Sequence, residues 1–160
     1  MKRIVFFLVL GWSLNASAAD PVLSMDGYGD AVFGAKLSMI EKRLGEKAKF
    51  SNDDHSCDFV QFRRYPKVWF MVEEGVLTRA DTDPGIPNVL GVSVGTTLKE
   101  IKRKYPTVIV EPQKYDPKGH YLIFKSADGK KAIVMEETGG KVTAIRGGVE
   151  PAVEYVEGCS

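Results

Sequence analysis

The chain has 160 residues, of which 44% are hydrophobic and 27% are charged, which are the proportions of an ordinary globular protein. Its 22 lysines and arginines nearly balance its 21 acidic residues, so the formal net charge is +1. These values exclude a strongly basic nucleic-acid-binding domain, a polytopic membrane protein and a cysteine-rich mini-protein. They predict one domain, or two small halves that share a core.

The first 19 residues have the pattern of a secretory signal peptide. Lys2 and Arg3 form a charged start, residues 4–14 are apolar, and residues 16–18 fit the Ala-x-Ala cleavage pattern. The apolar segment is shorter than the roughly 20 residues that a membrane-spanning helix needs. We therefore expect a periplasmic or secreted protein that loses residues 1–19 and does not insert into the membrane.

An internal repeat relates residues 33–45 to residues 94–106. Both segments carry a glycine followed by apolar residues at i, i+3 and i+7, the spacing of one helical face. The paired apolar residues are Leu37 and Leu98, Ile40 and Ile101, and Leu44 and Tyr105. Thr97 and Glu100 predict a capping box at the start of the second helix. Gly45 and Pro106 predict where the two helices end.

Runs of β-branched and aromatic residues follow each helix and predict strands. They cover residues 59–62, 68–71 and 75–78 in the first half, and 121–124, 132–135 and 140–143 in the second. Further strands are indicated at residues 107–111 and 153–157, and residues 81–88 read as a linker. The sequence therefore predicts an α+β fold of two tandem repeats, each a short helix packed on an antiparallel β-meander. The repeat units span residues 20–83 and 84–160.

Two cysteines, Cys57 and Cys159, predict a disulfide, because an even count in an exported chain is typical of one. Metal ligation and two free thiols are the alternatives. The bridge would join the end of the chain to its middle and close a loop of about 100 residues. The chain-entropy treatment gives such a loop at most about 4.7 kcal/mol of stability.

Two motifs resemble those of a widespread group of small exported bacterial proteins: residues 114–122 (KYDPKGHYL) and residues 151–159 (PAVEYVEGC). That group has no settled activity, so the resemblance implies a fold and a compartment but no reaction. More distantly, the helix-then-meander plan resembles the β-lactamase-inhibitor-protein group and the small lipoproteins of the outer-membrane β-barrel assembly machinery. The chain departs from the lipoproteins because it has no lipidation cysteine.

Residues 91–95 (GVSVG) match the G-x-S-x-G motif of hydrolases, and Asp116 and His120 follow Ser93 in the hydrolase order. The motif needs a long strand before the serine, whereas Pro84 and Pro87 leave about three residues for one. We therefore interpret this segment as the start of a helix and predict no catalytic residues. A non-enzymatic protein is expected, and a small serine hydrolase is the less favoured alternative.

Two acidic segments contain residues that could bind a metal, but neither predicts a site. In residues 53–58 (DDHSCD), the expected disulfide removes Cys57 as a ligand. Residues 81–83 begin like a calcium loop, but Val92 stands where the twelfth-position glutamate belongs. We expect neither a metal nor another cofactor. The glutamate pairs at residues 73–74 and 136–137 are interpreted as solvated strand ends.

Aromatic and arginine side chains mark the predicted partner-binding surface, because Trp, Tyr and Arg dominate interface hot spots. The candidates are Arg63, Arg64, Tyr65, Trp69, Tyr115, His120 and Tyr121. Core burial of Trp69 and a structural role for His120 are the alternatives. The basic residues of the second helix are interpreted as a solvated face, with binding to anionic envelope material as the alternative.

We expect an exported binding protein for a protein or cell-wall partner, without nucleic-acid binding. An inhibitor or immunity-type role is the most specific form of this expectation. An envelope assembly or stress-protection scaffold is the alternative.

Overall fold

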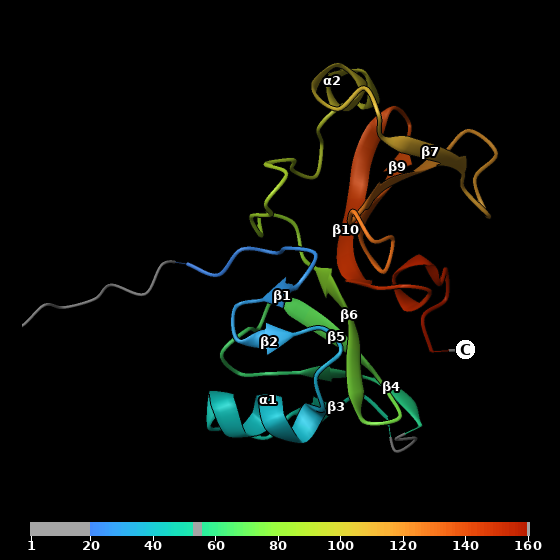
Figure 1. The fold of residues 1–160 in the computed structure, drawn as a ribbon. Helices are drawn as coiled ribbons and strands as arrows, with labels where there is room; N and C mark the ends of the chain where they lie inside the picture. Colours follow the sequence, from blue (N-terminus) through green and yellow to red (C-terminus); the bar gives the residue numbers. More distant parts are fainter. Residues whose placement is uncertain (1–19, 53–55, 160) are drawn as a thin grey trace, which may run out of the picture.

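The computed structural model describes residues 20–52 and 56–159, so the predicted signal peptide lies outside the described residues. The first half of the described chain contains β1 (Gly27–Tyr28), β2 (Ala31–Val32), α1 (Leu37–Leu44), β3 (Lys49–Phe50), β4 (Cys57–Gln61), β5 (Val68–Glu73) and β6 (Val76–Thr82). The second half contains α2 (Leu98–Lys104), β7 (Ile109–Pro112), β8 (His120–Lys125), β9 (Lys131–Thr138), β10 (Lys141–Val149) and the short 3-10 helix η1 (Ala152–Glu154) (Figure 1).

Eight strands form one antiparallel sheet in the order β3-β4-β5-β6-β10-β9-β8-β7, and β1 and β2 form a separate hairpin. The last strands of the two halves, β6 and β10, pair at the centre, with Thr82 opposite Ile145 and Arg79 opposite Gly148. A Cβ atom at Gly148 would lie 2.5 Å from the carbonyl oxygen of Thr78, so the close approach of these strands requires glycine. Backbone hydrogen bonds therefore join the two halves into a single sheet.

The main core lies on one face of this sheet, which we call the helix face. α1 contributes the buried side chains of Leu37, Ile40 and Leu44, and α2 contributes Ile101. They pack with buried strand residues that include Val60, Phe70, Leu77, Leu122, Ile133 and Met135. The predicted i, i+3, i+7 spacing therefore marks the buried face of α1, whereas only its middle position is fully buried in α2.

Each helix begins against the hairpin that ends its own half. The N–H groups of Gly34 and Leu37 donate to the carbonyl oxygens of Leu77 and Gly75, at 2.7 and 2.8 Å. In the second half, the N–H groups of Gly95 and Leu98 donate to the carbonyl oxygens of Val142 and Gly140, at 2.8 and 3.0 Å. Corresponding backbone groups therefore fix the position of both helices on the sheet.

The predicted helix ends are confirmed. Thr97 caps α2, its hydroxyl accepts a hydrogen bond from the Glu100 N–H, and the Glu100 carboxylate accepts one from the Thr97 N–H. Gly45 ends α1 in the left-handed region, with φ of 69°. α2 ends at Lys104, two residues before Pro106.

The α+β class is as predicted, but two elements differ. β6 continues to Thr82 and so includes the start of the predicted linker at residues 81–88. The predicted last strand at residues 153–157 is wrong, because Ala152–Glu154 form a 3-10 helix and the following residues have no strand partner. The carbonyl oxygens of Val153 and Tyr155 instead accept hydrogen bonds from arginine side chains.

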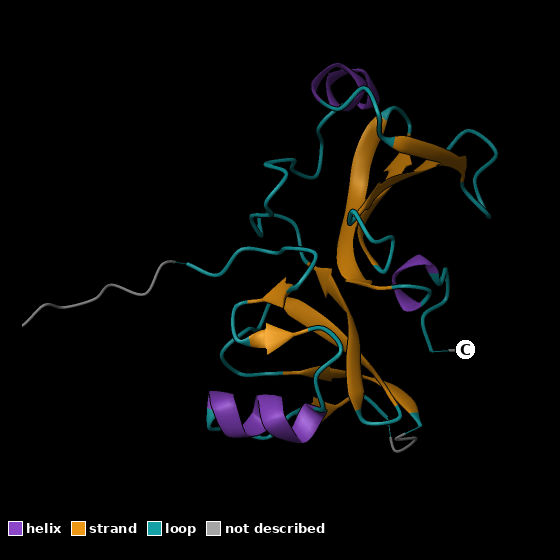
Figure 2. Ribbon diagram, viewed as in Figure 1, coloured by secondary structure: helices purple, strands orange, loops and turns teal. Residues whose placement is uncertain are grey.

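Residues 152–159, which we call the tail, cross the sheet face opposite the helices, which we call the tail face. Figure 2 shows η1 and the C-terminus on the other side of the strands from α1. Val153 is fully buried there and packs with Ile123, Ala132 and Val134 in a second, smaller cluster. The predicted disulfide is confirmed, because Cys159 is bonded to Cys57 at the start of β4, 102 residues away in the sequence.

Candidate functional site

The structure separates the seven predicted partner-binding residues into five places. Arg63 and Arg64 lie in the turn between β4 and β5, and Tyr65 lies in the core. Trp69 and Tyr121 lie on the tail face, and Tyr115 lies in the loop between β7 and β8. His120 precedes Tyr121 on β8, so its side chain is on the helix face. The sequence prediction therefore did not define one continuous surface.

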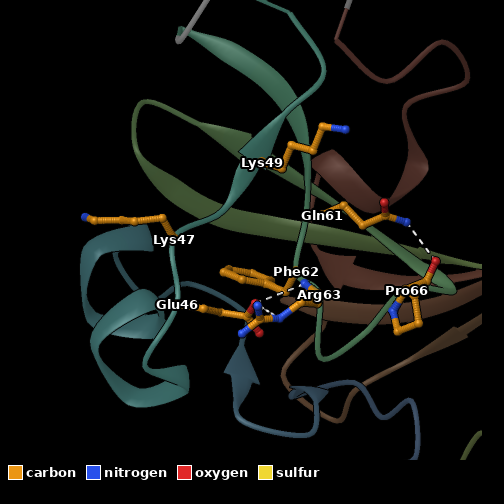
Figure 3. A pocket seen from close by; sticks show the side chains of 7 residues that line it. All are labelled: Glu46, Lys47, Lys49, Gln61, Phe62, Arg63 and Pro66. Carbon is orange, nitrogen blue, oxygen red and sulfur yellow. Dashed lines mark hydrogen bonds and ion pairs between the residues drawn. The ribbon is translucent and has the colours of Figure 1, made fainter.

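Arg63 borders a pocket at the β3 edge of the sheet (Figure 3). The carboxylate of Glu46 accepts hydrogen bonds from the backbone N–H groups of Arg63 and Arg64, at 3.1 and 3.0 Å. The side chain of Gln61 donates to the carbonyl oxygen of Pro66 at 2.8 Å. In Figure 3 the ammonium groups of Lys47 and Lys49 extend away from Glu46. These contacts hold the β4–β5 turn in place, and Glu46 already has its partners within the chain.

Tyr65 and His120 are held by intramolecular contacts. Tyr65 is only 7% exposed, its hydroxyl accepts a hydrogen bond from the Asp30 N–H, and its ring packs edge-on against Tyr28. Tyr65 is therefore a core residue rather than an accessible anchor. The Nδ1 atom of His120 lies 2.5 Å from a carboxylate oxygen of Glu137, which is 1% exposed.

Trp69 belongs to a row of paired residues across the tail face. In an antiparallel ladder, directly opposed residues project to the same face. From β5 to β7 across the sheet, the row consists of Trp69, Asp81, Arg146, Val134, Ile123 and Ile109. Trp69 is 40% exposed, so the alternative that it is buried in the core is wrong. The next row on the same face contains Ala144, Glu136, Tyr121 and Glu111.

Beside the tail, these rows form the floor of a cleft in the second half of the sheet. Its walls are the tail and the start of the β7–β8 loop. The residues that line it are Glu111, Pro112, Lys114, Tyr121, Ile123, Val134, Arg146, Glu154 and Val156. We call it the tail cleft. It combines apolar side chains from the sheet with charged groups from β7, the β7–β8 loop, β10 and the tail.

Arg146 is the most deeply buried charged residue of the tail cleft, with 3% of its surface exposed. Its Nε atom donates to the carbonyl oxygen of Val153 at 2.7 Å, and its Nη1 atom is paired with the carboxylate of Glu136. The guanidinium carbon lies 5.7 Å from the centre of the Tyr121 ring, within cation–π distance. Among the described residues, the buried Nη2 atom has no hydrogen-bond partner.

Arg79 holds the tail at a second point. Its Nε and Nη2 atoms contact both carboxylate oxygens of Asp81, at 2.8 and 2.6 Å. Its Nη1 atom donates to the carbonyl oxygen of Tyr155 at 2.7 Å. Arg79 thus neutralises the charge of Asp81, a residue of the predicted linker. Unlike Arg146, Arg79 has a partner for each of its three nitrogen atoms.

The mouth of the tail cleft is closed on one side by contacts to Glu157. Its carboxylate lies 2.6 Å from the Lys114 ammonium and also accepts a hydrogen bond from the Tyr115 hydroxyl. The hydrogen bond from Lys114 lowers the pKa of Glu157 below its ordinary value. The β7–β8 loop and the tail are therefore connected by a charged contact at the surface.

On the other side of the tail, Lys125 binds two carboxylates. Its ammonium lies 3.1 Å from Glu150 and 2.9 Å from Glu154. Hydrogen bonds to Glu154 and Glu150 raise the pKa of Lys125, whereas burial and the neighbouring Glu154 raise the pKa of Glu150. Lys125, which does not line the tail cleft, therefore neutralises the charge of Glu154.

The hydrolase motif does not have the local structure that catalysis requires. No strand leads directly into Ser93 within the described residues, because β6 ends at Thr82. The Ser93 N–H donates to the Thr96 hydroxyl in the turn before α2. His120 contacts Glu137 instead of Asp116, whose side chain accepts a hydrogen bond from the Lys118 N–H. In the described part of the chain, no group of three or more His, Cys, Asp or Glu residues could hold a metal ion. Residues 53–55 of the first acidic segment lie outside it.

None of the helices in the described ranges is both long and apolar enough to cross a membrane. No family model and no curated protein matches the chain.

Two solved structures are similar to it. An extracellular protein containing a SCP domain from Bacillus anthracis str. Ames has a TM-score of 0.49 and 10% identity, over 89% of this chain and 50% of that chain. A cysteine-rich secretory protein from Staphylococcus aureus subsp. aureus Mu50 has a TM-score of 0.45 and 13% identity, over 79% of this chain and 47% of that chain. This chain therefore spans about half the length of either protein. At this level of similarity, neither structure assigns a function to it.

Sequence reasoning missed the two arginines that organise the tail face. Arg79 and Arg146 each follow an apolar or small strand residue and precede another, as in Ile145-Arg146-Gly147. A charged residue is almost never fully buried unless it is paired. An arginine inside an otherwise apolar strand was therefore the signal that could have located this site.

Proposed function

We propose that this chain is an exported, non-enzymatic binding protein whose protein partner contacts the tail face beside Trp69. The observation that carries this proposal is the exposure of a tryptophan in the middle of a strand. The neighbours Val68 and Phe70 point to the helix face and are fully buried, whereas Trp69 is 40% exposed. A large aromatic side chain at such a position is a typical interface anchor.

The surroundings of Trp69 support a rigid contact surface. Asp81 lies opposite Trp69 and is fixed by Arg79, which also holds the tail. A surface that is ordered before binding loses less conformational entropy on association. This favours a partner that docks onto a preformed sheet face.

The disulfide supports export, because such bonds persist in oxidising compartments. Within the envelope we propose an inhibitor or immunity-type role, in which the rigid tail face covers the active site or binding surface of the partner. An assembly or stress-protection scaffold is the second candidate. The identity of the partner separates them, since an inhibitor contacts an enzyme or toxin and a scaffold contacts other assembly components.

We also propose that the two halves are copies of one structural unit. The hydrogen bonds at Gly34 and Leu37 correspond to those at Gly95 and Leu98. Each helix is followed by four strands that run towards the centre of the sheet from opposite edges. The β1–β2 hairpin in the first half and the tail in the second are the parts without a counterpart.

Site-specific photo-cross-linking in the native cell envelope tests the binding proposal. A photoreactive phenylalanine analogue at position 69 is expected to give one discrete adduct, which excess wild-type protein suppresses. The matched control is position 39 in α1, where Met39 is 58% exposed. Equal adducts from both positions, or no adduct from position 69, would contradict a partner on the tail face.

A further inference from the structure

The geometry of the tail cleft points to a second binding function, for a ligand that carries a carboxylate on an apolar body. Arg146 is the residue that binds the carboxylate. This inference does not depend on a protein partner at Trp69, because the tail cleft is formed by the chain's own sheet, loop and tail.

The unpaired donor of Arg146 is the first reason. A guanidinium offers five N–H donors in a fixed plane. Val153 and Glu136 accept from Nε and Nη1, while Nη2 has no acceptor among the described residues and is shielded from solvent. A buried donor without an acceptor is costly. Arg146 lines the tail cleft, so an acceptor that enters the cleft and reaches Nη2 would remove this cost.

The surroundings of this donor are the second reason. Tyr121 lies beneath the guanidinium, and Ile123 and Val134 are 3% and 1% exposed on the floor. Val156 adds an apolar side chain from the tail. Charged hydrogen bonds are stronger in such a low-dielectric setting, and apolar walls favour an organic body behind the carboxylate.

The charges around the tail cleft restrict the ligand further. Glu136 is neutralised by Arg146, and Glu154 is paired with Lys125. The remaining charged residues of the tail cleft are Lys114 and Glu111, which lie at its mouth. Lys114 contacts Glu157, and Glu111 is exposed. A singly charged carboxylate meets little repulsion here, whereas a doubly charged phosphate would meet the nearby glutamates at close range. The ligand is therefore a small organic acid or the free C-terminus of a peptide.

Matched acid and amide probes test this inference with the oxidised protein. N-acetyl-leucine is expected to shift the amide NMR signals of Tyr121, Ile123 and Val134 in a saturable way. N-acetyl-leucinamide should bind at least about tenfold more weakly, because it lacks the charge that strengthens the hydrogen bond.

A short peptide ending in leucine, with a free or an amidated C-terminus, forms the second arm of the experiment. Tighter binding of the free peptide than of N-acetyl-leucine identifies a chain end as the ligand, and the reverse identifies a free acid. Equal affinity for acid and amide, or no saturable shift with either, would overturn the inference.

Variants around the tail cleft supply the controls. Val156→Trp fills it from the tail and should abolish acid binding, whereas Val89→Trp, at a 58% exposed position, should not. Glu111→Gln should tighten acid binding severalfold, because it removes a negative charge from the mouth. Weaker acid binding after Glu111→Gln would contradict the inference, as would unchanged acid binding after Val156→Trp.

Arg146→Lys keeps the charge but removes the planar fork, and should weaken acid binding by about tenfold. Because Arg146 also holds Glu136 and the tail, the fold of this variant is checked by circular dichroism. If it does not fold, the results for Val156→Trp and Glu111→Gln decide the question.

Discussion

The helices of the two halves occupy corresponding positions on the sheet but are stabilised by different means. α1 has no side-chain cap at Lys36, buries three apolar residues and ends at a left-handed glycine. α2 has a complete capping box, buries only Ile101 and has Tyr105 rather than a glycine as its C-cap. The backbone bonds to the hairpins are the feature that both share. The sheet therefore sets the position of both helices. The source of their stability differs, because α1 relies more on packing and α2 more on capping.

Breaking the covalent link between the halves should have the largest effect. The double variant Cys57→Ala with Cys159→Ala removes a bridge that closes 102 residues, and should lower the free energy of unfolding by up to about 4.7 kcal/mol. Urea unfolding of this variant and of the reduced wild type should give the same value. A loss below about 1 kcal/mol would mean that the arginine contacts alone hold the tail.

Removing the central apolar residue of each helix should come next. Ile40 and Ile101 are both 1% exposed, so Ile40→Ala and Ile101→Ala should each cost about 3 kcal/mol in urea unfolding. Met39→Ala, at a position 58% exposed, is the control and should change stability by less than about 0.5 kcal/mol. Similar losses would support the proposal of two copies of one unit, whereas a loss at only one site would argue against it.

The caps should distinguish the two helices more finely. Thr97→Ala removes the hydroxyl of the capping box and should cost about 1 kcal/mol. Lys36→Ala occupies the corresponding position in α1, where no side chain caps the helix, and should cost less than about 0.5 kcal/mol. Equal costs at the two positions, measured by thermal or urea unfolding, would contradict the contrast between capping and packing.

The smallest expected effect is the pH dependence of the α2 cap. Hydrogen bonds from the Thr97 side chain and backbone lower the pKa of Glu100 below its ordinary 4.5. A lowered folded-state pKa contributes stability above the ordinary value, and this is lost as the pH falls through the folded-state pKa.

Glu100→Gln should therefore differ from wild type at neutral pH and approach it in acid. Unfolding measured at both pH values checks this. The pH-dependent difference should shrink in the Thr97→Ala background, and an unchanged difference there would contradict the assignment to the capping box.

The local features of the fold could be predicted, because short-range patterns determine them. The capping box, the glycine that ends α1 and the apolar face of α1 depend on residues within one or two helical turns. The pairing of β6 with β10 could not be predicted, because it joins residues more than 60 positions apart, such as Thr82 and Ile145. The short hairpin strands β1 and β2 carry no strand-like run in the sequence.

The tail and the candidate site show a second limit. Val153 and Tyr155 alternate with acidic residues as in a strand, but their carbonyl oxygens bind Arg146 and Arg79 rather than a neighbouring strand. Arg79 lies 76 residues before Tyr155, so no local pattern indicates this contact. Trp69 and Tyr121 were identified from residue type alone, whereas the tail cleft, which Tyr121 lines, depends on the sheet order.

The central position of β10 affects how the chain must assemble after synthesis. The first seven strands of the large sheet cannot form one continuous sheet without β10, because β10 is the strand that pairs with both β6 and β9. A nascent chain that lacks its last 20 or so residues therefore presents two open sheet edges, a configuration prone to wrong pairing with other chains. The strand order therefore leaves the edges of β6 and β9 unpaired until β10 is in place.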